Sequence, residues 1–464
     1  MIENEHKTLG DLWKKVSEKT AEKKYQKFKN LLLDDFDNLF NDEGFGQGGQ
    51  SAICSVTGEE TEKVTEIDED VKISPQVQEQ KEIGQALAKN DYIIFSNHRQ
   101  PNLKVNSYGS LVGRNYWLLT NKDLVQTENT EVCLTVKIEI NFIKPQSTST
   151  KNIAYSYRFY GGNEVAFDKK GKAKNFEQLA GIDREDNEND NSPIVKSECT
   201  GSFNRLAILR MDVDGLGQIF IKGFNKETAS FSAYATLSGQ LDWFFSGYLN
   251  TIRSKEDYKD WVNIIYSGGD DVFAVGRWDK TIAFAEEIQS EFKLFTGRED
   301  ITVSAGISIV TPKFPIAKGA DLAGEAEHLA KDFKRLDKRE KDALCLFGIA
   351  VGWEEFKIIK DIKDFWLEHL EGENPILSRG LLQKVFTWYA ISKRKDKNEN
   401  PNLSWKWNTA YSLKRYEVKD NKKKNDALKM IEIALLCNQF GGKPIRFDVF
   451  VVASRWAELI LRDK

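Results

Sequence analysis

Two short acidic motifs in this chain of 464 residues have the composition of a metal-dependent phosphoryl-transfer site. The motif DVDG places Asp212 and Asp214 two residues apart, and the motif YSGGDD ends in Asp270 and Asp271. Carboxylates hold Mg²⁺ or Mn²⁺ against a nucleoside triphosphate. Two such ions about 4 Å apart can activate an attacking hydroxyl and neutralise the leaving pyrophosphate. The motifs therefore favour an enzyme that polymerises or cyclises nucleotides.

Glycines accompany both motifs where a triphosphate would approach the main chain. Gly268 and Gly269 remove side chains from the second motif and permit unusual φ values. Gly215 and Gly217 follow the first motif, where backbone N–H groups just before a helix could bind phosphates. The predicted nucleotide contacts at the two motifs are Gly215, Leu216, Gly217, Gly268 and Gly269.

Two lysines on a predicted helix could supply positive charge. Lys331 and Lys334, in the segment AEHLAKDFK, could reach the β- and γ-phosphates, although a solvated helix face explains their spacing equally well. His328 is interpreted as a packed or surface residue. Ser304 and Gly306, on a predicted strand, are expected to pack beneath the site, because small residues allow strands and helices to approach closely.

The pattern of apolar residues predicts the strands and helices that carry these residues. The predicted order is a strand at 206–213, a helix at 231–252, strands at 262–266 and 272–276, a helix at 280–295, a strand at 301–310 and a helix at 320–334. This order is that of a ferredoxin-like palm. In such a sheet the first strand lies beside the hairpin, so Asp212 and the turn that carries Asp270 can converge.

The rest of the chain predicts an α/β region before the palm and a helical region after it. Helices are expected within 8–40 and at 78–89, then a strand at 91–97 and an antiparallel meander between 110 and 165. From residue 354 the pattern is helical, interrupted by polar inserts at 393–402 and 420–426. We expect an α+β multidomain chain with a middle domain at 1–195, a palm at 196–350 and a helical C-terminal domain at 351–464.

Composition narrows the class of protein. The 67 Lys and Arg residues nearly balance the 71 Asp and Glu residues, for a net charge of −4, which argues against a wholly basic nucleic-acid coat but allows a local basic face. Inserts near Lys393 and Lys422 could contact RNA, although solvated loops are the simpler interpretation. Five scattered cysteines and no apolar run of membrane length predict a cytoplasmic protein with reduced thiols.

Each motif taken alone has a structural explanation. A lone GGDD sequence could be a hairpin turn, since Gly and Asp dominate turns. A lone DVDG could be a loop or a calcium-like site, although the spaced ligands of an EF-hand are missing. Both motifs end strands at palm spacing, and carboxylates crowded into one site repel one another unless metal is bound. The combination therefore favours an active site.

Several linked motifs together resemble the large polymerase/cyclase subunit of type III CRISPR effector complexes, with the Csm-type (III-A) branch most similar. The palm motifs are RMDVDGLG, TLSGQLDWFF, IIYSGGDDVFAVGRWD, ITVSAGISI and AEHLAK. Upstream, LGDLWKKVSEKTAEKKYQKF, QKEIGQALAKNDYIIF and NFEQLAG resemble the family's middle domain. Downstream, LFGIAVGWEEF and the helical tail resemble its last domain. The resemblance runs from about Thr8 to the end of the chain.

The resemblance implies a subunit that joins other type III CRISPR subunits and CRISPR RNA and is activated by target RNA. Its palm would convert ATP into 3′–5′ linked cyclic oligoadenylates with Mg²⁺ or Mn²⁺. Carried over by position, Asp212, Asp270 and Asp271 match the catalytic metal-binding residues, and Lys331 matches a phosphate-side lysine of related GGDEF-type cyclases. Ser267, Gly268 and Gly269 match the turn that contacts the nucleotide.

The sequence departs from the family in two respects. Family members commonly begin with an HD nuclease domain and a first palm, whereas none of the four His here is followed by Asp, so no HD nuclease site is expected. The second palm would come from a separate HD/first-palm polypeptide or a second copy; a naturally split subunit and a truncated chain both fit. Cys54 is followed by Thr57 where a second zinc-binding Cys is expected, so we predict no structural zinc.

Two other functions remain as alternatives. A diguanylate-cyclase-like enzyme would share the palm and the GGD turn, but Asp271 is followed by Val272 where GGDEF enzymes place Phe. A non-catalytic scaffold of the complex is disfavoured, because a scaffold has no physical need for clustered carboxylates. A variant of the main hypothesis joins AMP to another small molecule.

Overall fold

The computed structural model places the greater part of the chain in helices and strands. It describes residues 9–34, 36, 52–61, 63–68, 71–89, 92–96, 116–120, 132–135, 162, 165–185, 194–197, 203–225, 229–335, 340–395 and 401–463. The chain forms two compact units, a larger one of Met1–Tyr25, Gly161–Phe314 and Lys318–Lys464, and a smaller one of Gln26–Tyr160 and Pro315–Ala317. The division into three domains at 195 and 350 stays a prediction.

The smaller unit contains short helices and antiparallel strand pairs. Its elements are α2 (Lys29–Asp34), β1 (Ala52–Ile53), β2 (Glu60–Thr61), β3 (Thr65–Asp68), β4 (Val71–Ile73), α4 (Pro75–Lys89), β5 (Tyr92–Ser96), β6 (Tyr116–Thr120) and β7 (Val132–Thr135). Strands β6 and β7 both pair antiparallel with β5, in the order β6-β5-β7. The predicted meander is therefore wrong in its order, because both edges of a strand offer the same main-chain groups and the pattern does not say which edge is used. The last strand of the expected meander, at 153–162, lies almost wholly outside the described residues.

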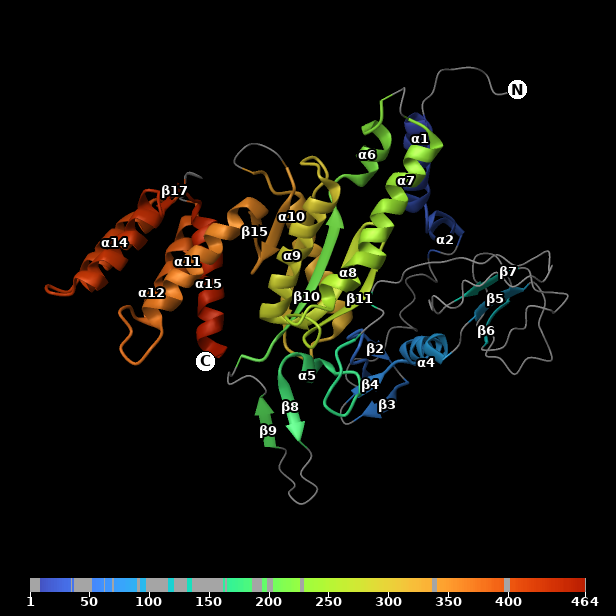
Figure 1. Ribbon diagram of the computed structural model, residues 1–464, viewed down its shortest axis with the longest axis horizontal. Coiled ribbons are helices and arrows are strands. Elements are labelled where there is room, and N and C mark those ends of the chain that lie inside the picture. The colour runs from blue at the N-terminus through green and yellow to red at the C-terminus, as the bar shows by residue number, and fades with distance from the viewer. Residues whose placement is uncertain are drawn as a thin grey trace. The chain divides into compact units, whose positions relative to one another are not determined.

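A six-stranded sheet forms the centre of the larger unit (Figure 1). Its strands are β10 (Leu206–Val213), β11 (Val262–Gly268), β12 (Asp271–Arg277), β13 (Val303–Val310), β14 (Ala343–Leu346) and β15 (Ile349–Gly352), in the order β11-β12-β10-β13-β14-β15. The first four give the predicted ferredoxin-like palm, with β10 antiparallel to both β12 and β13. Strand β14 adds parallel to β13, and β15 pairs with β14. Sequence patterning did not predict these two strands.

Helices cover both faces of this sheet. They are α7 (Phe231–Asp242), the π-helical segment η3 (Trp243–Tyr248), α8 (Leu249–Arg253), α9 (Trp278–Thr296) and α10 (Ile316–Lys331). Successive side chains of a strand point to opposite faces. Leu209 and Met211 of β10 accordingly join a core with side chains of η3 and α9, while Ile208 and Arg210 lie against α10 at Gly319 and Gly324.

The predicted palm helices are confirmed, with two differences. The helix expected at 231–252 contains the π-helical turn of η3. The helix expected at 320–334 ends at Lys331, so Lys334 lies beyond it. The unit also contains α1 (Leu9–Tyr25), α5 (Phe176–Leu179), β8 (Ile182–Glu185), β9 (Ile194–Ser197) and α6 (Leu216–Lys222). Helix α1 packs on α6 through Trp13, whose ring stacks on Phe220 at 5.2 Å between centroids.

The C-terminal part is helical, as predicted. It contains η4 (Trp353–Glu355), α11 (Phe356–Leu370), α12 (Arg379–Ser392), α13 (Ser404–Tyr416), α14 (Lys422–Leu436) and α15 (Phe447–Asp463), with the short strands β16 (Gln439–Phe440) and β17 (Lys443–Pro444). The polar insert expected at 420–426 is wrong in its extent, because α14 begins at Lys422. Asn421 caps this helix by accepting a hydrogen bond from the Lys424 N–H at 3.0 Å.

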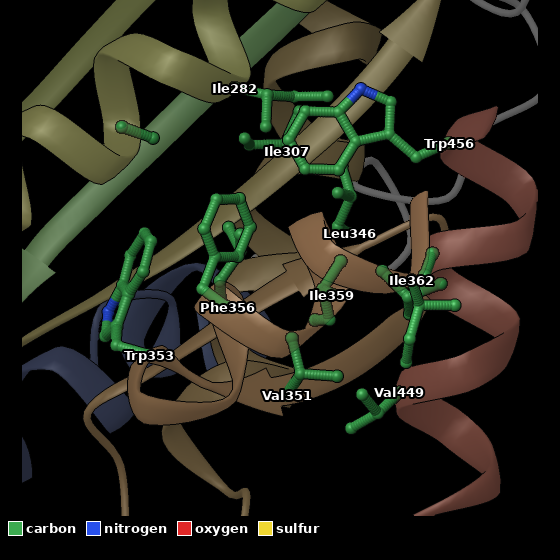
Figure 2. Packing of buried hydrophobic residues seen from close by; sticks show 14 of the residues in the cluster. Ile282, Ile307, Leu346, Val351, Trp353, Phe356, Ile359, Ile362, Val449 and Trp456 are labelled. Carbon is green, nitrogen blue, oxygen red and sulfur yellow. The ribbon is translucent and has the colours of Figure 1, made fainter. Parts of the chain in front are cut away.

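The palm sheet and the C-terminal helices share one hydrophobic core. Figure 2 shows part of it, in which Ile307, Leu346 and Val351 of the sheet gather with Ile359 of α11 and Val449 of α15. Trp456 of α15 and Phe356 of α11 also belong to this cluster, with their ring centroids 5.5 Å apart. The helices therefore support the same sheet that carries the acidic motifs. No helix in the described part of the chain has both the length and the apolar character needed to cross a membrane.

Candidate active site

Three carboxylates meet at one end of the palm sheet. Asp212 is the penultimate residue of β10, and its register partner on β12 is Asp271, the first residue of that strand. Asp270 precedes β12, and its carbonyl accepts a hydrogen bond from the Val213 N–H at 3.1 Å. The structure thus brings together Asp212, Asp270 and Asp271, which sequence analysis predicted would converge.

The turn between β11 and β12 is tighter than the motif suggests. Gly268 and Asp271 still pair across the two strands, so only Gly269 and Asp270 form the turn. Gly269 has a φ of 69°, in the left-handed region that favours glycine. This two-residue turn places Asp270 at the tip of the hairpin and Asp271 at the start of β12.

The hairpin tip is bonded to the helical layer beneath it. The Ser267 side chain is buried, and its hydroxyl donates to the Phe245 carbonyl in η3 at 2.6 Å. The Gly269 N–H donates to Asp242 Oδ1 at 3.4 Å, and the Ser246 hydroxyl donates to the same oxygen at 2.9 Å. Ser267, predicted as a nucleotide contact, therefore uses its side chain to hold the turn in place.

Burial and mutual repulsion act on these carboxylates together. Burial, followed by the charge of Asp212, raises the pKa of Asp270 to about 6. The same two causes, in the same order, raise the pKa of Asp271. Raised carboxyl pKa values mean that the site disfavours the negative charge it would carry at neutral pH. Such a site gains stability from bound positive charge.

Lys331 supplies one positive charge. Its ammonium, at the end of α10, pairs with Asp212 and with Glu327, the latter at 3.0 Å. Burial acts against this ammonium, but the hydrogen bond to Asp212 and the nearby carboxylates outweigh it, and the pKa of Lys331 is raised. Glu327 is itself buried and lies 3.4 Å from Arg210 of β10. Sequence analysis missed Glu327 and Arg210, although Glu327 lies one helical turn before Lys331.

Of the other residues predicted around Lys331, two are exposed and two pack beneath the site. Lys334 is not at the site, because its side chain is 76% exposed and pairs with Glu340 at 3.7 Å. His328 is exposed on α10, as expected for a surface residue. Ser304 is fully buried, and a Cβ on Gly306 would lie 2.1 Å from the Glu327 nitrogen. The prediction that small residues allow close approach beneath the site is therefore confirmed.

The two carboxylates of the DVDG motif have different roles. Asp214 is buried, and its Oδ2 accepts hydrogen bonds from the Thr302 hydroxyl at 2.7 Å and the Asp342 N–H at 3.0 Å. These bonds tie the end of β10 to the chain just before β13 and β14. The expectation that the carboxylates of both motifs crowd into one site is therefore wrong for Asp214, because its carboxylate holds strand ends together.

The predicted phosphate loop follows directly. Gly215, with a φ of 64°, precedes the first residue of α6, and Leu216 and Gly217 form the first turn of that helix. A Cβ added to Gly217 would meet no atom within 4 Å, so the backbone there is open to approach. The loop begins three residues after Asp212, at the same end of the sheet as the hairpin turn.

The residues fit a hard divalent cation, although they do not form a closed cage. Among the described residues, no group of three or more His, Cys, Asp or Glu side chains is arranged to hold one metal ion. Mg²⁺ is usually bound through one or two carboxylates plus water and substrate phosphates, so a closed protein cage is not required. The repelling, partly buried carboxylates are donors suited to such an ion. The absence of a structural zinc stays a prediction.

Comparisons with known proteins agree with this geometry. Residues 205–345 match the family model of the second palm domain of Cas10/Cmr2. The chain is 30% identical over 388 residues to a CRISPR system single-strand-specific deoxyribonuclease Cas10/Csm1 (subtype III-A) of Methanocaldococcus jannaschii, covering 76% of this chain and 45% of that protein. The chain therefore spans about half the length of the curated relative that it matches.

Solved structures show the same fold. Csm1 of T. onnurineus matches with a TM-score of 0.53 at 20% identity, over 80% of this chain and 49% of that chain. A Csm1–Csm4 cassette in complex with cA4 matches with a TM-score of 0.51 at 19% identity, over 80% of this chain and 48% of that chain. At these identities the likeness supports the palm-containing α+β fold.

Proposed function

We propose that this chain, a homologue of the Cas10/Csm1 proteins of subtype III-A, uses its palm to join ATP molecules into cyclic oligoadenylates. One observation carries the proposal: Asp212, Asp270 and Asp271 converge from two paired strands onto a glycine turn, with Lys331 against them. This arrangement provides what nucleotidyl transfer requires, namely oxygen ligands for a divalent ion and a cation for the phosphates.

Each residue has a distinct role in the proposed reaction. Asp212, Asp270 and Asp271 would hold Mg²⁺ or Mn²⁺, which when bound assists deprotonation of the attacking 3′-hydroxyl and neutralises the leaving pyrophosphate. Lys331 pairs with Asp212, and its ammonium would bind the triphosphate of the nucleotide. The backbone at Gly215, Leu216 and Gly217 and the turn at Gly268 and Gly269 lie against the phosphates.

The supporting elements determine how rigid this site is. The bond from Ser267 to Phe245 holds the hairpin tip on η3, and the bond from Gly269 to Asp242 holds it on the end of α7. The bonds of Asp214 hold the DVDG loop on the starts of β13 and β14. Because both acidic motifs are fixed to the same sheet, the carboxylates are positioned before substrate binds, which is how enzymes lower the cost of orientation.

The proposed assembly is a type III CRISPR complex. The related Csm1–Csm4 cassette, which binds cA4, supports both the product class and the presence of other subunits. A palm that faces this one is proposed to come from a separate HD/first-palm polypeptide or from a second copy of the chain. CRISPR RNA and target RNA are proposed as the guide and the trigger.

The test supplies the assembled complex with target RNA, Mg²⁺ or Mn²⁺, and ATP or GTP, and identifies products by mass spectrometry. We expect cyclic oligoadenylates from the wild type and none from Asp270→Ala/Asp271→Ala. Asp257→Ala is the matched control, since this carboxylate is 79% exposed and pairs with Lys280, away from the motifs. Unchanged product in the double variant would refute the site. A cyclic dinucleotide made from GTP would favour the diguanylate-cyclase alternative, and no product under any condition would favour the scaffold.

A further inference from the structure

Two consecutive residues just before β14 have a left-handed backbone. Lys341 has a φ of 69° and Asp342 a φ of 50°. Neither is glycine, and each such residue costs about 1 kcal/mol or more unless surrounding contacts hold it. Residues in this conformation concentrate at active sites and ligand-binding sites, so the contacts of this segment bear on function.

Contacts on both sides hold the segment in place. The Lys341 N–H donates to the Phe333 carbonyl at 3.0 Å, and the Asp342 N–H donates to Asp214 Oδ2 at 3.0 Å. The Asp342 carboxylate accepts a hydrogen bond from Arg335 Nη1 at 2.6 Å. The backbone of the segment is thus bonded to Asp214, the buried carboxylate of the DVDG motif.

This backbone brings the Lys341 ammonium to the predicted phosphate loop. A Cβ built on Gly215 would lie 3.5 Å from Lys341 Nζ. The Lys341 side chain is only partly exposed, and it forms no ion pair with any residue that the structure describes. Lys331 and Lys334, by contrast, are paired with Asp212 and Glu340. The ammonium at Gly215 therefore has no ion-pair partner within the described part of the protein.

We infer that Lys341 is a second phosphate-binding lysine of the active site. It contacts the triphosphate from the Gly215 side, while Lys331 contacts it from the Asp212 side. Both lysines belong to the single crossover from β13 through α10 to β14. This one connection therefore places both ammonium groups at the end of β10. An ammonium is a compact charge suited to phosphate oxygens. This inference rests on the proposed function, because it concerns the same nucleotide site.

The strained backbone provides a substitution that separates binding from folding. Glycine adopts positive φ at no steric cost, so Lys341→Gly removes the ammonium and relieves the backbone at the same position. Its melting temperature is expected to equal or exceed that of the wild type. A loss of ATP binding in this variant therefore cannot be attributed to unfolding.

The experiment measures binding of ATP and AMP to the full chain with Mg²⁺ by isothermal titration calorimetry, with AMP measured by competition. Loss of one charged contact to phosphate should weaken ATP binding by about tenfold in Lys341→Gly and in Lys341→Gln. AMP, which lacks the outer phosphates, should change by less than about twofold in the same variants. Lys341→Arg should restore most of the ATP affinity. Lys334→Gln is the matched control, because it removes an exposed lysine nearby, and it should bind both nucleotides as the wild type does.

Two failures can be told apart. If the wild type binds ATP and the Lys341 variants bind it equally well, or lose ATP and AMP in equal measure, the inference is wrong and the proposed function stands. If the wild type itself binds no ATP, the proposed function fails and this inference fails with it.

Discussion

At the scale of single residues, the site is a set of carboxylates placed where their charge is unfavourable. Asp270 is the clearest case, since burial and the charge of Asp212 raise its pKa to about 6. A folded-state pKa above the unfolded value means that the proton stabilises the fold. This stabilisation is fully present below about pH 4 and is lost as the pH rises through about 6. The metal-free protein should therefore be less stable at neutral pH than its packing alone would allow.

Asp270→Asn should consequently stabilise the metal-free protein. The variant keeps the shape and removes the charge. Because the side chain is partly exposed, we expect a gain of only about 1 kcal/mol in the free energy of unfolding at pH 8. The gain should shrink between pH 6 and pH 4 and vanish below that range, as followed by urea unfolding in EDTA. A gain that is the same at pH 4 and pH 8 would show that charge is not its origin.

Lys331→Met should have the opposite effect. It removes the ammonium that pairs with Asp212 and Glu327 and leaves two carboxylates without that partner. The free energy of unfolding in EDTA should fall by about 1–3 kcal/mol, and Mg²⁺ should recover part of the loss because the ion replaces the missing charge. Lys334→Met, at an exposed position, should change stability by no more than about 0.5 kcal/mol. Equal effects of the two substitutions would contradict the assigned pairing.

The sequence predicted the residues of the site better than the direction of their side chains. Asp212, Asp270 and Asp271 converge because strand order places β10 beside β12, and strand order follows from the pattern of elements. Asp214 and Lys334 were misplaced because each lies just beyond the end of an element, where tertiary bonds decide orientation. Lys341 carries no motif, and only its left-handed backbone brings it to Gly215.

At the scale of elements, the close packing of α10 on β13 places Lys331 beside Asp212. This approach depends on Gly306, since a Cβ there would lie 2.1 Å from the Glu327 nitrogen and 2.3 Å from the Ala323 carbonyl oxygen. Both atoms are backbone and cannot rotate away. The sheet and the helix would have to separate to admit even a methyl group.

Gly306→Ala should therefore destabilise the protein by about 3 kcal/mol or more, through overpacking. Gly239→Ala in α7 is the matched control, because a Cβ there meets no atom within 4 Å and alanine favours helices. It should be neutral or stabilising by up to about 1 kcal/mol. Chemical unfolding of the two variants against the wild type gives the comparison. A Gly306→Ala protein as stable as the wild type would mean that the helix does not pack this closely.

Prediction of elements succeeded where patterns were long and failed where they were short. The palm strands and helices were found because their apolar patterns extend over at least five residues of the sequence. Strands β14 and β15 were missed because four-residue apolar runs do not distinguish a strand from part of a helix. The order β6-β5-β7 was missed because pairing depends on loop paths that patterning does not encode.

At the scale of the whole molecule, the palm and the C-terminal helices of the larger unit behave as one body, because a single hydrophobic core joins them. Trp366 of α11 is fully buried, and its indole N–H donates to the Ser454 hydroxyl of α15 at 2.9 Å. Trp366→Ala should cost about 3–5 kcal/mol.

The loss of stability caused by Trp366→Ala should extend to the palm sheet. Hydrogen exchange of peptides from β10 should accelerate in Trp366→Ala together with exchange of peptides from α11 and α15. Arg379→Ala, an exposed substitution at the start of α12, should leave exchange in β10 unchanged. Accelerated exchange confined to the C-terminal helices would show that the palm folds independently of them.

The central claim is that Asp212, Asp270 and Asp271 form the metal site of an ATP-using palm. Its most direct test is the binding of Mn²⁺ by the full chain with and without ATP, followed by electron paramagnetic resonance. We expect the wild type to bind Mn²⁺ more tightly when ATP is present, since phosphate oxygens would complete the coordination. We also expect Asp212→Asn and Asp270→Asn to reduce the Mn²⁺ affinity in the presence of ATP by at least about tenfold. Asp257→Asn, at an exposed position, should leave it unchanged. Equal Mn²⁺ affinity in the wild type and both site variants would show that these carboxylates do not form the metal site.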